Sequence, residues 1–386
     1  MSSDLDLTKM TLLDSDISDC PYDAYGKLRA EAPVWRDNAT GMYVITRYED
    51  VRMVLSDTER FTSARHRGRV DPRSAKIKAM YEQDGWVPGA TLAARDDPEH
   101  REMRGLFNHA FRPSKIKEMD PFIEVLAHQL IDDFIDDGQC DWVRSFAIPL
   151  PLIVIGRQMG ARDEDMWQIK AWTDAWVQRL GMMQSDDEAF WSTAQEIEAQ
   201  HYFQPIFERL RDQPDNTLLS DLVNTVIPEW GRTLTDNELH AEMMADTFVG
   251  GSETTTNAIS AGMKLLIEHK EVWDRLKSDP DRYIKPFTEE VLRLESPVQS
   301  LMRAASRPEA VGEAEKVGLV DRGEHLGDGT LDDLVFQRGN AERSLPPVRL
   351  RDVRSPHRLR SVRTSLQPSG EVLQIGFQVC SVVPPR

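Results

Sequence analysis

The chain has no run of about 18 apolar residues, the length that a membrane-spanning helix needs, so no transmembrane helix is expected. Its opening sequence, MSSDLDLTKM, lacks the basic and apolar stretches of a secretory signal peptide, and none is expected there. Cysteine is scarce: Cys20, Cys140 and Cys380 are scattered and odd in number, which argues against a disulfide framework. These absences together predict a protein of the reducing cytoplasm.

Positive charge is also in short supply. The 47 Lys and Arg residues stand against 65 Asp and Glu residues, which gives a net charge of -18. Binding to nucleic acid phosphates or to an anionic membrane requires a basic surface, so neither is expected as a partner. The 386 residues, 40% of them hydrophobic, are enough for one large domain with a substantial core.

The pattern of apolar residues predicts a helix-rich chain with little sheet. Two β-prone runs, residues 33–36 and 42–46, flank the turn-rich residues 37–41 and predict a hairpin. Between about 97 and 230, apolar residues recur at helical spacing, most clearly from 122 to 134. The predicted fold class is therefore mainly α with small β-sheets (α+β), arranged as one domain rather than separate modules.

The composition changes abruptly near Arg307. Residues 307–386 contain no Trp and no Tyr, Arg almost replaces Lys, and the helical and strand periodicities fade. We therefore divide the chain into a domain of residues 1–306 and an atypical Arg-rich tail of residues 307–386. A change of reading frame near this point would produce such a tail, and a genuinely divergent or truncated tail is the alternative.

A long helix with a weak centre is predicted between about 235 and 267. Thr235 and Glu238 form a capping-box sequence, and apolar residues then follow one helical face.

Inside this predicted helix lies VGGSETTT, residues 249–256, where each glycine costs about 1 kcal/mol relative to Ala. Such a segment could let a flat body approach, could open the helix through its hydroxyl groups, and could relay protons through an acid beside an alcohol. Close packing between helices through the two glycines is the ordinary alternative. A serine hydrolase elbow is disfavoured, because Thr254 stands where that motif needs Gly.

This segment resembles the central oxygen-binding helix of the cytochrome P-450 family, whose pattern is Ala/Gly-Gly-x-Asp/Glu-Thr-Thr. The residues that match in order are Gly250, Gly251, Glu253, Thr254 and Thr255. The resemblance implies that heme b lies under the helix at the two glycines. It also implies that the catalytic pair, Glu253 and Thr254, delivers protons for cleavage of the O–O bond.

Three further motifs occur in the order that the resemblance requires. Glu290 and Arg293 match the family's Glu-x-x-Arg helix, where the pair is structural and buried, and where breaking such a pair costs about 3–5 kcal/mol. His100 and Arg104 match its heme-propionate helix, and Arg303 matches the Arg that meets the second propionate. Read alone, these motifs are a solvated salt bridge, a charged surface turn and a surface Arg. Their order supports the resemblance over residues 15–306.

The resemblance stops before the family's iron-binding loop, Phe-x-x-Gly-x-x-x-Cys-x-Gly, so the fold is expected to be C-terminally incomplete. Cys380 is preceded by Gly376 at the required spacing, but Leu373 and Val382 stand where Phe and Gly are needed. The axial thiolate is therefore not identified, and no metal ligand is assigned. Zinc is not expected, because the histidines 100 and 109 do not share the i,i+4 spacing of a helical metal site.

The resemblance implies a heme-dependent monooxygenase that activates O2 and hydroxylates an apolar small molecule, with impaired activity in this chain. The alternatives are a non-catalytic remnant that binds heme weakly or only a small ligand, and a helical interaction scaffold, which the lack of repeats disfavours. A ferredoxin or flavoprotein would donate electrons, docking on a patch of Arg101, Arg112, Lys115 and Lys117. The loops at 64–93 and 180–187 would shape the substrate pocket.

Overall fold

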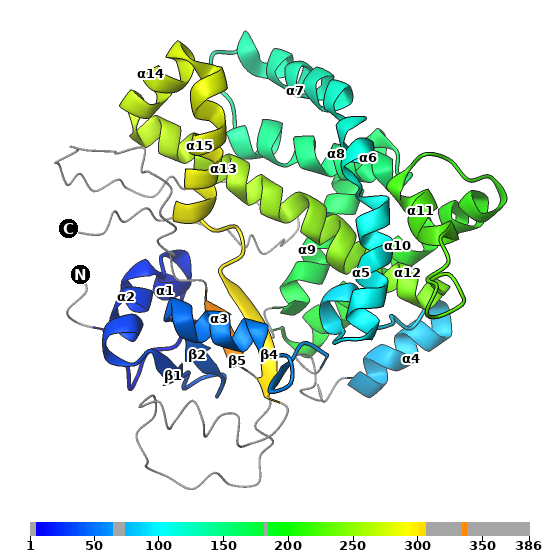
Figure 1. Ribbon diagram of the computed structural model, residues 1–386, viewed down its shortest axis with the longest axis horizontal. Coiled ribbons are helices and arrows are strands. Elements are labelled where there is room, and N and C mark those ends of the chain that lie inside the picture. Colours follow the sequence, from blue (N-terminus) through cyan, green and yellow to red (C-terminus); the bar gives the residue numbers. More distant parts are fainter. Residues whose placement is uncertain (1–4, 65–73, 181–183, 306–333, 338–386) are drawn as a thin grey trace, which may run out of the picture.

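The computed structural model describes residues 5–64, 74–180, 184–305 and 334–337. Helices make up most of this part of the chain, and a small sheet lies to one side with the first three helices (Figure 1). The fold is mainly α with a small β-sheet, as the sequence predicts. None of the described helices is long and apolar enough to cross a membrane.

The helices and strands have the following bounds. The strands are β1 Val34–Arg36, β2 Tyr43–Ile45, β3 Phe61–Thr62, β4 Ser300–Ala305 and β5 Leu334–Gln337. The α-helices are α1 Ser15–Asp19, α2 Tyr22–Glu31, α3 Tyr48–Ser56, α4 Ser74–Asp84, α5 Glu99–Ala110, α6 Pro113–Lys117, α7 Asp120–Ile135, α8 Pro149–Gln158, α9 Met166–Leu180, α10 Asp186–Asp212, α11 Leu218–Asn224, α12 Asp236–Glu242, α13 Thr254–Glu268, α14 Lys270–Ser278 and α15 Pro280–Leu294. Two π-helical stretches, η2 Val143–Ala147 and η4 Met243–Glu253, and two 3-10 turns, η1 Leu92–Ala94 and η3 Asp163–Asp165, complete them.

The predicted hairpin is confirmed. Strands β1 and β2 pair antiparallel, with Trp35 opposite Val44. The buried carboxylate of Asp37 accepts hydrogen bonds from the N–H groups of Ala39 and Thr40, both at 2.9 Å, and so fixes the turn. Gly41 closes it with a φ of 70°, a left-handed conformation that a residue without Cβ adopts easily.

The five strands form one sheet in the order β1-β2-β5-β4-β3. Strand β5 pairs parallel with β2 and antiparallel with β4, so a segment beyond residue 306 lies at the centre of the sheet. The sequence pattern of the tail predicts no strand, so it fails to predict β5. The rest of the proposed tail, Cys380 included, lies outside the described residues.

The irregular loop predicted for residues 64–93 is partly wrong, because α4 occupies its middle. The helix consists largely of Ala, Lys, Glu, Gln and Met, which favour helix intrinsically, although they do not produce a clear apolar stripe. Buried polar contacts secure it: Tyr81 donates to Glu196 of α10 at 2.9 Å and accepts from Arg179 of α9 at 2.8 Å. The other predicted loop, 180–187, ends where Ser185 caps α10 through a capping box.

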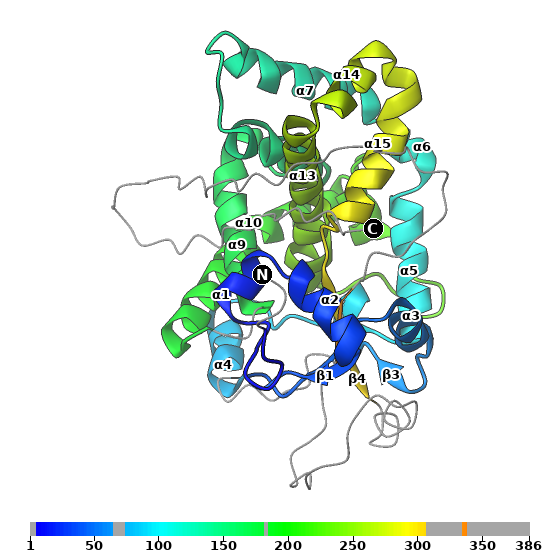
Figure 2. The same ribbon diagram turned by 90° about the vertical axis from the view of Figure 1, so that its left-hand side faces the viewer.

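The main core lies where α10 crosses the long helix formed by α12, η4 and α13. Phe203 and Phe207 of α10 and Phe248 of η4 are fully buried there, and the rings of Phe203 and Phe248 lie 5.2 Å apart. Figure 2 shows α13 running through the middle of the helical part, with α15 alongside. The long helix is thus the central element on which the other helices pack.

Candidate functional site

The predicted long helix exists, and its weak centre is a π-helix. Residues 236–268 run without a break through α12, η4 and α13, and the wide turns coincide with the Gly-Gly-Ser-Glu stretch. The hydroxyl of Ser252 donates to the carbonyl oxygen of Phe248 at 2.6 Å, and that of Thr254 donates to Gly250 at 3.0 Å. These hydroxyl groups supply partners to carbonyls that a wider helix leaves less well bonded, which is the opening that the sequence predicts.

The two glycines have different surroundings. A Cβ atom on Gly251 would lie 2.9 Å from Cγ1 of Ile155 in α8, so this glycine permits close packing between helices. A Cβ atom on Gly250 would meet nothing within 4 Å. Close packing between helices therefore explains Gly251, whereas Gly250 faces open space that a flat ring could fill.

Glu253 is held by a lysine from another helix. The Nζ atom of Lys170 on α9 lies 2.9 Å from Oε1 of Glu253 and also pairs with Asp174. Burial opposes the charge on Lys170, but the two carboxylates outweigh it and raise the pKa of this ammonium group. The sequence pattern gave no signal for Lys170, because no motif joins residues so far apart in the chain. The arrangement places an anchored carboxylate next to the Thr254 hydroxyl.

Three residues predicted to hold heme propionates have no carboxylate that satisfies them fully. Arg104 makes only a hydrogen bond to Asn108 at 3.2 Å, and Nδ1 of His100 lies 3.5 Å from Asp97. Arg303 on β4 is half-buried, and burial lowers the pKa of its guanidinium group. Within the described part of the chain, neither arginine forms a salt bridge. Two guanidinium groups that form no ion pair among the described residues suit an anionic ligand, which is the second respect in which the site fits heme.

Contacts at the sheet edge bring the start of α5 toward Arg303. Asp96, just before α5, accepts hydrogen bonds from the N–H of Ser63 at 2.8 Å and from the hydroxyl of Thr62. Thr62 of β3 pairs with Ala304, the neighbour of Arg303 in β4. The carboxylate of Asp96 is close enough to Arg303 to counteract the effect of burial on its pKa.

The Glu290–Arg293 pair forms but is not buried as predicted. Two short contacts, 2.8 and 2.5 Å, join the carboxylate to the guanidinium group in a bidentate pair on α15. The two side chains are 35% and 36% exposed. Water screens a pair of this exposure, so its contribution falls to about 1 kcal/mol or less. The cost of about 3–5 kcal/mol expected for breaking a buried pair is therefore too high for Glu290 and Arg293.

An apolar groove of about 490 Å³ lies along α13, just beyond the opened stretch of the helix. Its walls come from α13 (Ile259, Met263, Leu266) and α15 (Phe287, Val291), and Thr254 also lines it. Leu292 of α15, another lining residue, is 41% exposed. An apolar groove on this side agrees with the expected C-terminally incomplete fold.

No axial ligand can be assigned among the described residues. Cys140 is free and exposed on the loop before η2, while Cys20 is disulfide-bonded. The described ranges contain no group of three or more His, Cys, Asp or Glu residues that could hold a metal ion, which leaves the zinc expectation untouched. The side of the site that would hold the iron ligand thus lies beyond what the structure describes.

The predicted docking patch is only half available. Lys115 is 2% exposed and pairs with Asp221 at 2.6 Å, and Arg112 pairs with the same carboxylate at 2.9 Å. Both cations therefore join this region to α11, and Lys115 presents no charge to a partner, whereas the Arg112 side chain is 38% exposed. Arg101 remains 77% exposed, although Asp97 pairs with it.

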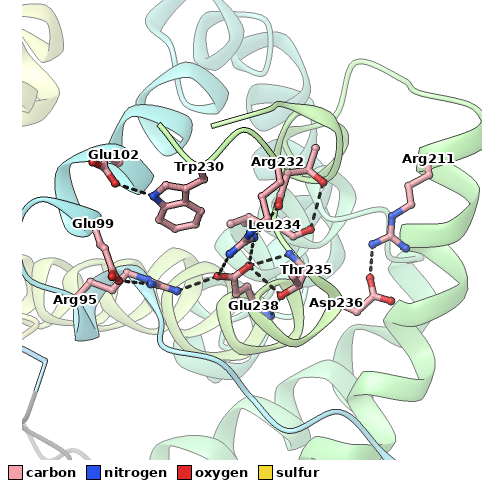
Figure 3. Close-up of polar contacts among 11 residues, drawn as sticks. Arg95, Glu99, Glu102, Arg211, Trp230, Arg232, Leu234, Thr235, Asp236 and Glu238 are labelled. Atoms are coloured by element: carbon pink, nitrogen blue, oxygen red, sulfur yellow. Dashed lines mark hydrogen bonds and ion pairs between the residues drawn. The ribbon is translucent and has the colours of Figure 1, made fainter. Parts of the chain in front are cut away.

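A larger polar cluster at the start of α12 was predicted only as a capping box. Figure 3 shows Glu238 between Arg95 and Arg232, with Thr235 on its other side. Its carboxylate accepts from the N–H of Thr235 at 2.9 Å and from Arg232 at 2.7 Å. Burial would raise the pKa of Glu238, but these donors outweigh it and lower the pKa to about 2. The cluster fixes the N-terminal end of the helix that carries the site.

Comparison with known proteins agrees with this geometry. Residues 163–314 match the model of the cytochrome P-450 family. The chain is similar to two cytochromes P-450 of Bacillus subtilis. It is 30% identical to YjiB over 76% of this chain and 69% of that protein, and 31% identical to PksS of polyketide biosynthesis over 72% and 67%. Among solved structures, P450BioI in complex with an acyl carrier protein ligated to hexadec-9Z-enoic acid superimposes with a TM-score of 0.69 at 25% identity, over 85% of this chain and 79% of that one.

Proposed function

The chain belongs to the cytochrome P-450 family, and from that membership we propose that it is a heme-dependent monooxygenase of impaired activity. One observation carries the proposal: the central helix opens at Gly250, which faces open space, directly before an anchored acid and a hydroxyl. A helix that only packs against its neighbours gains nothing from that opening, and the cost of the glycine would remain unexplained.

Heme, the cofactor of the family, supplies when bound the activation of O2 that lets one oxygen atom enter a C–H bond. In this proposal the Thr254 hydroxyl turns from the Gly250 carbonyl to donate a hydrogen bond into the open face, and Glu253 takes up a proton from solvent and passes it to that hydroxyl. Lys170 orients Glu253 through the 2.9 Å ion pair between its ammonium group and the carboxylate. Arg104, His100 and Arg303 hold the propionates. Glu290 and Arg293 have a structural role.

The substrate proposed is an apolar small molecule. Similar proteins support this class: a steroid C26-monooxygenase of Mycobacterium tuberculosis is 31% identical over 72% of this chain and 65% of that protein. The ligand of the P450BioI complex is likewise a fatty acyl group. We further propose a ferredoxin or flavoprotein as electron donor, docked near Arg101 rather than on the complete predicted patch, and a cytoplasmic location.

The impairment follows from the tail. The sequence of residues 307–386 lacks the complete iron-binding loop, and the groove beside α13 remains open. We keep the division into a domain of residues 1–306 and an Arg-rich tail as a proposal, with the reading-frame change as its cause. Sequencing the coding DNA across codons 306 and 307, together with mass spectrometry of the C-terminal peptides, tests it. An uninterrupted frame that encodes this tail would contradict the frameshift.

Heme content of the full chain tests the function. After incubation with heme, we expect substoichiometric binding and no thiolate-type Soret band when the protein is reduced and treated with CO. Arg104→Ala and Arg303→Ala should each lower heme occupancy further, whereas Arg101→Ala on the same α5 helix is a matched control that should not. A normal thiolate band would refute the impairment. Complete absence of heme binding, with stabilisation by an apolar ligand, would favour the non-catalytic remnant.

A further inference from the structure

Two carboxylic acids of the central helix hold a neighbouring loop by its backbone. The N–H group of Leu92 donates to Oε1 of Glu242 at 2.6 Å, and the N–H of Ala93 donates to Oδ2 of Asp246 at 2.9 Å. Glu242 ends α12, and Asp246 lies one turn further along, in η4. The 3-10 turn η1 thus crosses the helix at a pair of acids that no predicted motif includes.

The two acids also face each other. Glu242 is 1% exposed, and one of its carboxylate oxygens has no hydrogen-bond donor. Asp246 follows four residues later on the same helix and binds the next N–H group of the same loop, so the two carboxyl groups are neighbours. Two ionised carboxylates at such a separation repel each other, whereas one proton between them turns the contact into a short hydrogen bond. The contact is therefore favourable only if the pair holds a proton.

The charged groups around Glu242 do not neutralise the pair in place of a proton. Arg95 is the cation whose field reaches it, but Arg95 already pairs with Glu238 at 3.2 Å and with Glu99 at 2.7 Å. Burial is the largest cause that raises the pKa of Glu242 well above its usual value, and Asp246 raises it further. The Leu92 N–H group and Arg95 lower it by less.

Other polar groups at the same crossing also lack a partner among the residues that the structure describes. The hydroxyl groups of Thr91, next to Leu92, and of Thr247, next to Asp246, are buried without a hydrogen bond, as is Nε of Arg95. Buried groups of this kind normally bind ordered water that makes two to four hydrogen bonds, roughly. The crossing therefore gathers several unpaired polar atoms within an otherwise apolar core.

We propose that Glu242 and Asp246 share one exchangeable proton at neutral pH and form a second proton-holding site on the central helix. Asp246 is partly exposed and precedes Gly250 by four residues, so it lies on the side of the helix that opens at that glycine. Water at the crossing would carry the proton between the pair and this open face. Its use in oxygen chemistry rests on the proposed function, but the shared proton does not.

Infrared spectroscopy of the full chain tests the proton directly. At pH 7 we expect a carboxylic-acid C=O band that disappears in Glu242→Gln and shifts in Asp246→Asn. Glu238→Gln is the control on the same helix and should leave the band unchanged, because Glu238 is ionised. Transfer to D2O should shift the band within the mixing time. A spectrum that does not change in Glu242→Gln, or a band that resists D2O for hours, would overturn the proposal.

A second measurement covers the case in which spectra overlap. The folded pair should bind one more proton than the unfolded chain between about pH 5 and 7, so the parent loses stability there as the pH rises. Replacing the neutral acid by a neutral amide removes this loss. As the pH rises through this range, the ratio of the unfolding constant of the parent to that of Glu242→Gln should therefore increase by up to about tenfold per pH unit. If this ratio of unfolding constants stays the same from about pH 5 to 7, the shared proton is refuted. Neither measurement needs heme. A failure of heme binding would therefore contradict the proposed function without contradicting the shared proton.

Discussion

Replacing Glu238 by Gln should destabilise the protein strongly at neutral pH and little in acid. The Glu238 side chain is 10% exposed and accepts hydrogen bonds from the backbone of Thr235 and from Arg232, with Arg95 beside it. Its pKa falls from 4.5 to about 2 on folding. This difference corresponds to about 3 kcal/mol of stability from ionisation. Because the folded pKa is the lower one, that stability is present above about pH 5 and is lost as the pH falls toward 2.

Urea unfolding of the parent and of Glu238→Gln at several pH values measures this contribution. We expect a difference in the free energy of unfolding of about 3 kcal/mol at pH 7 that shrinks to about 1 kcal/mol near pH 3. Glu99→Gln is the matched control, since Glu99 pairs with the same Arg95 but is 62% exposed, and its loss should change stability by less than about 1 kcal/mol. An equal difference at both pH values would mean that Glu238 acts by packing alone, and the electrostatic reasoning would be wrong.

Three further predictions concern the helix and the groove. Gly251→Ala should cost about 1–3 kcal/mol in urea unfolding, because its Cβ would lie 2.9 Å from Ile155, whereas Gly250→Ala should be neutral or stabilising. Equal effects of the two substitutions would contradict the assignment of only one glycine to packing. A double-mutant cycle of Lys170→Met and Glu253→Gln should give a coupling of about 1–3 kcal/mol, and additive effects would show that the 2.9 Å pair is not formed in solution. The open groove should bind an apolar fluorescent dye under native conditions, and fluorescence no higher than that of a fully packed protein would indicate that the groove is filled.

Local chemistry explains which parts of the fold could be predicted. The hairpin turn at Asp37 and the capping box at Thr235 depend on residues within four positions of each other, and both form. The opened centre of the long helix was likewise predictable, because Gly and Thr act on their own turn. Helix α4 was missed because intrinsic propensity and polar anchoring form it without the amphipathic pattern that reveals most helices.

The candidate site was predictable only where a family pattern covers it. Gly250, Glu253 and Thr254 follow such a pattern, and so does Arg303, which lies close to Asp96. Lys170 and Asp246 belong to no pattern, since their partners come from other elements and only tertiary packing brings them together. The loss of Lys115 from the docking patch has the same origin, because its partner lies about one hundred positions away.

The position of β5 also has a consequence for the order in which the protein can be built. Its parallel partner β2 is synthesised early, but Tyr43 of β2 cannot pair with Leu334 of β5 until β5 has been synthesised. At about 5–20 residues per second, the ribosome needs roughly 15–60 s to make the chain between them. During that time β2 presents an unpaired edge, which favours contact with other nascent chains and with chaperones. The yield of folded protein should therefore depend on the speed of translation.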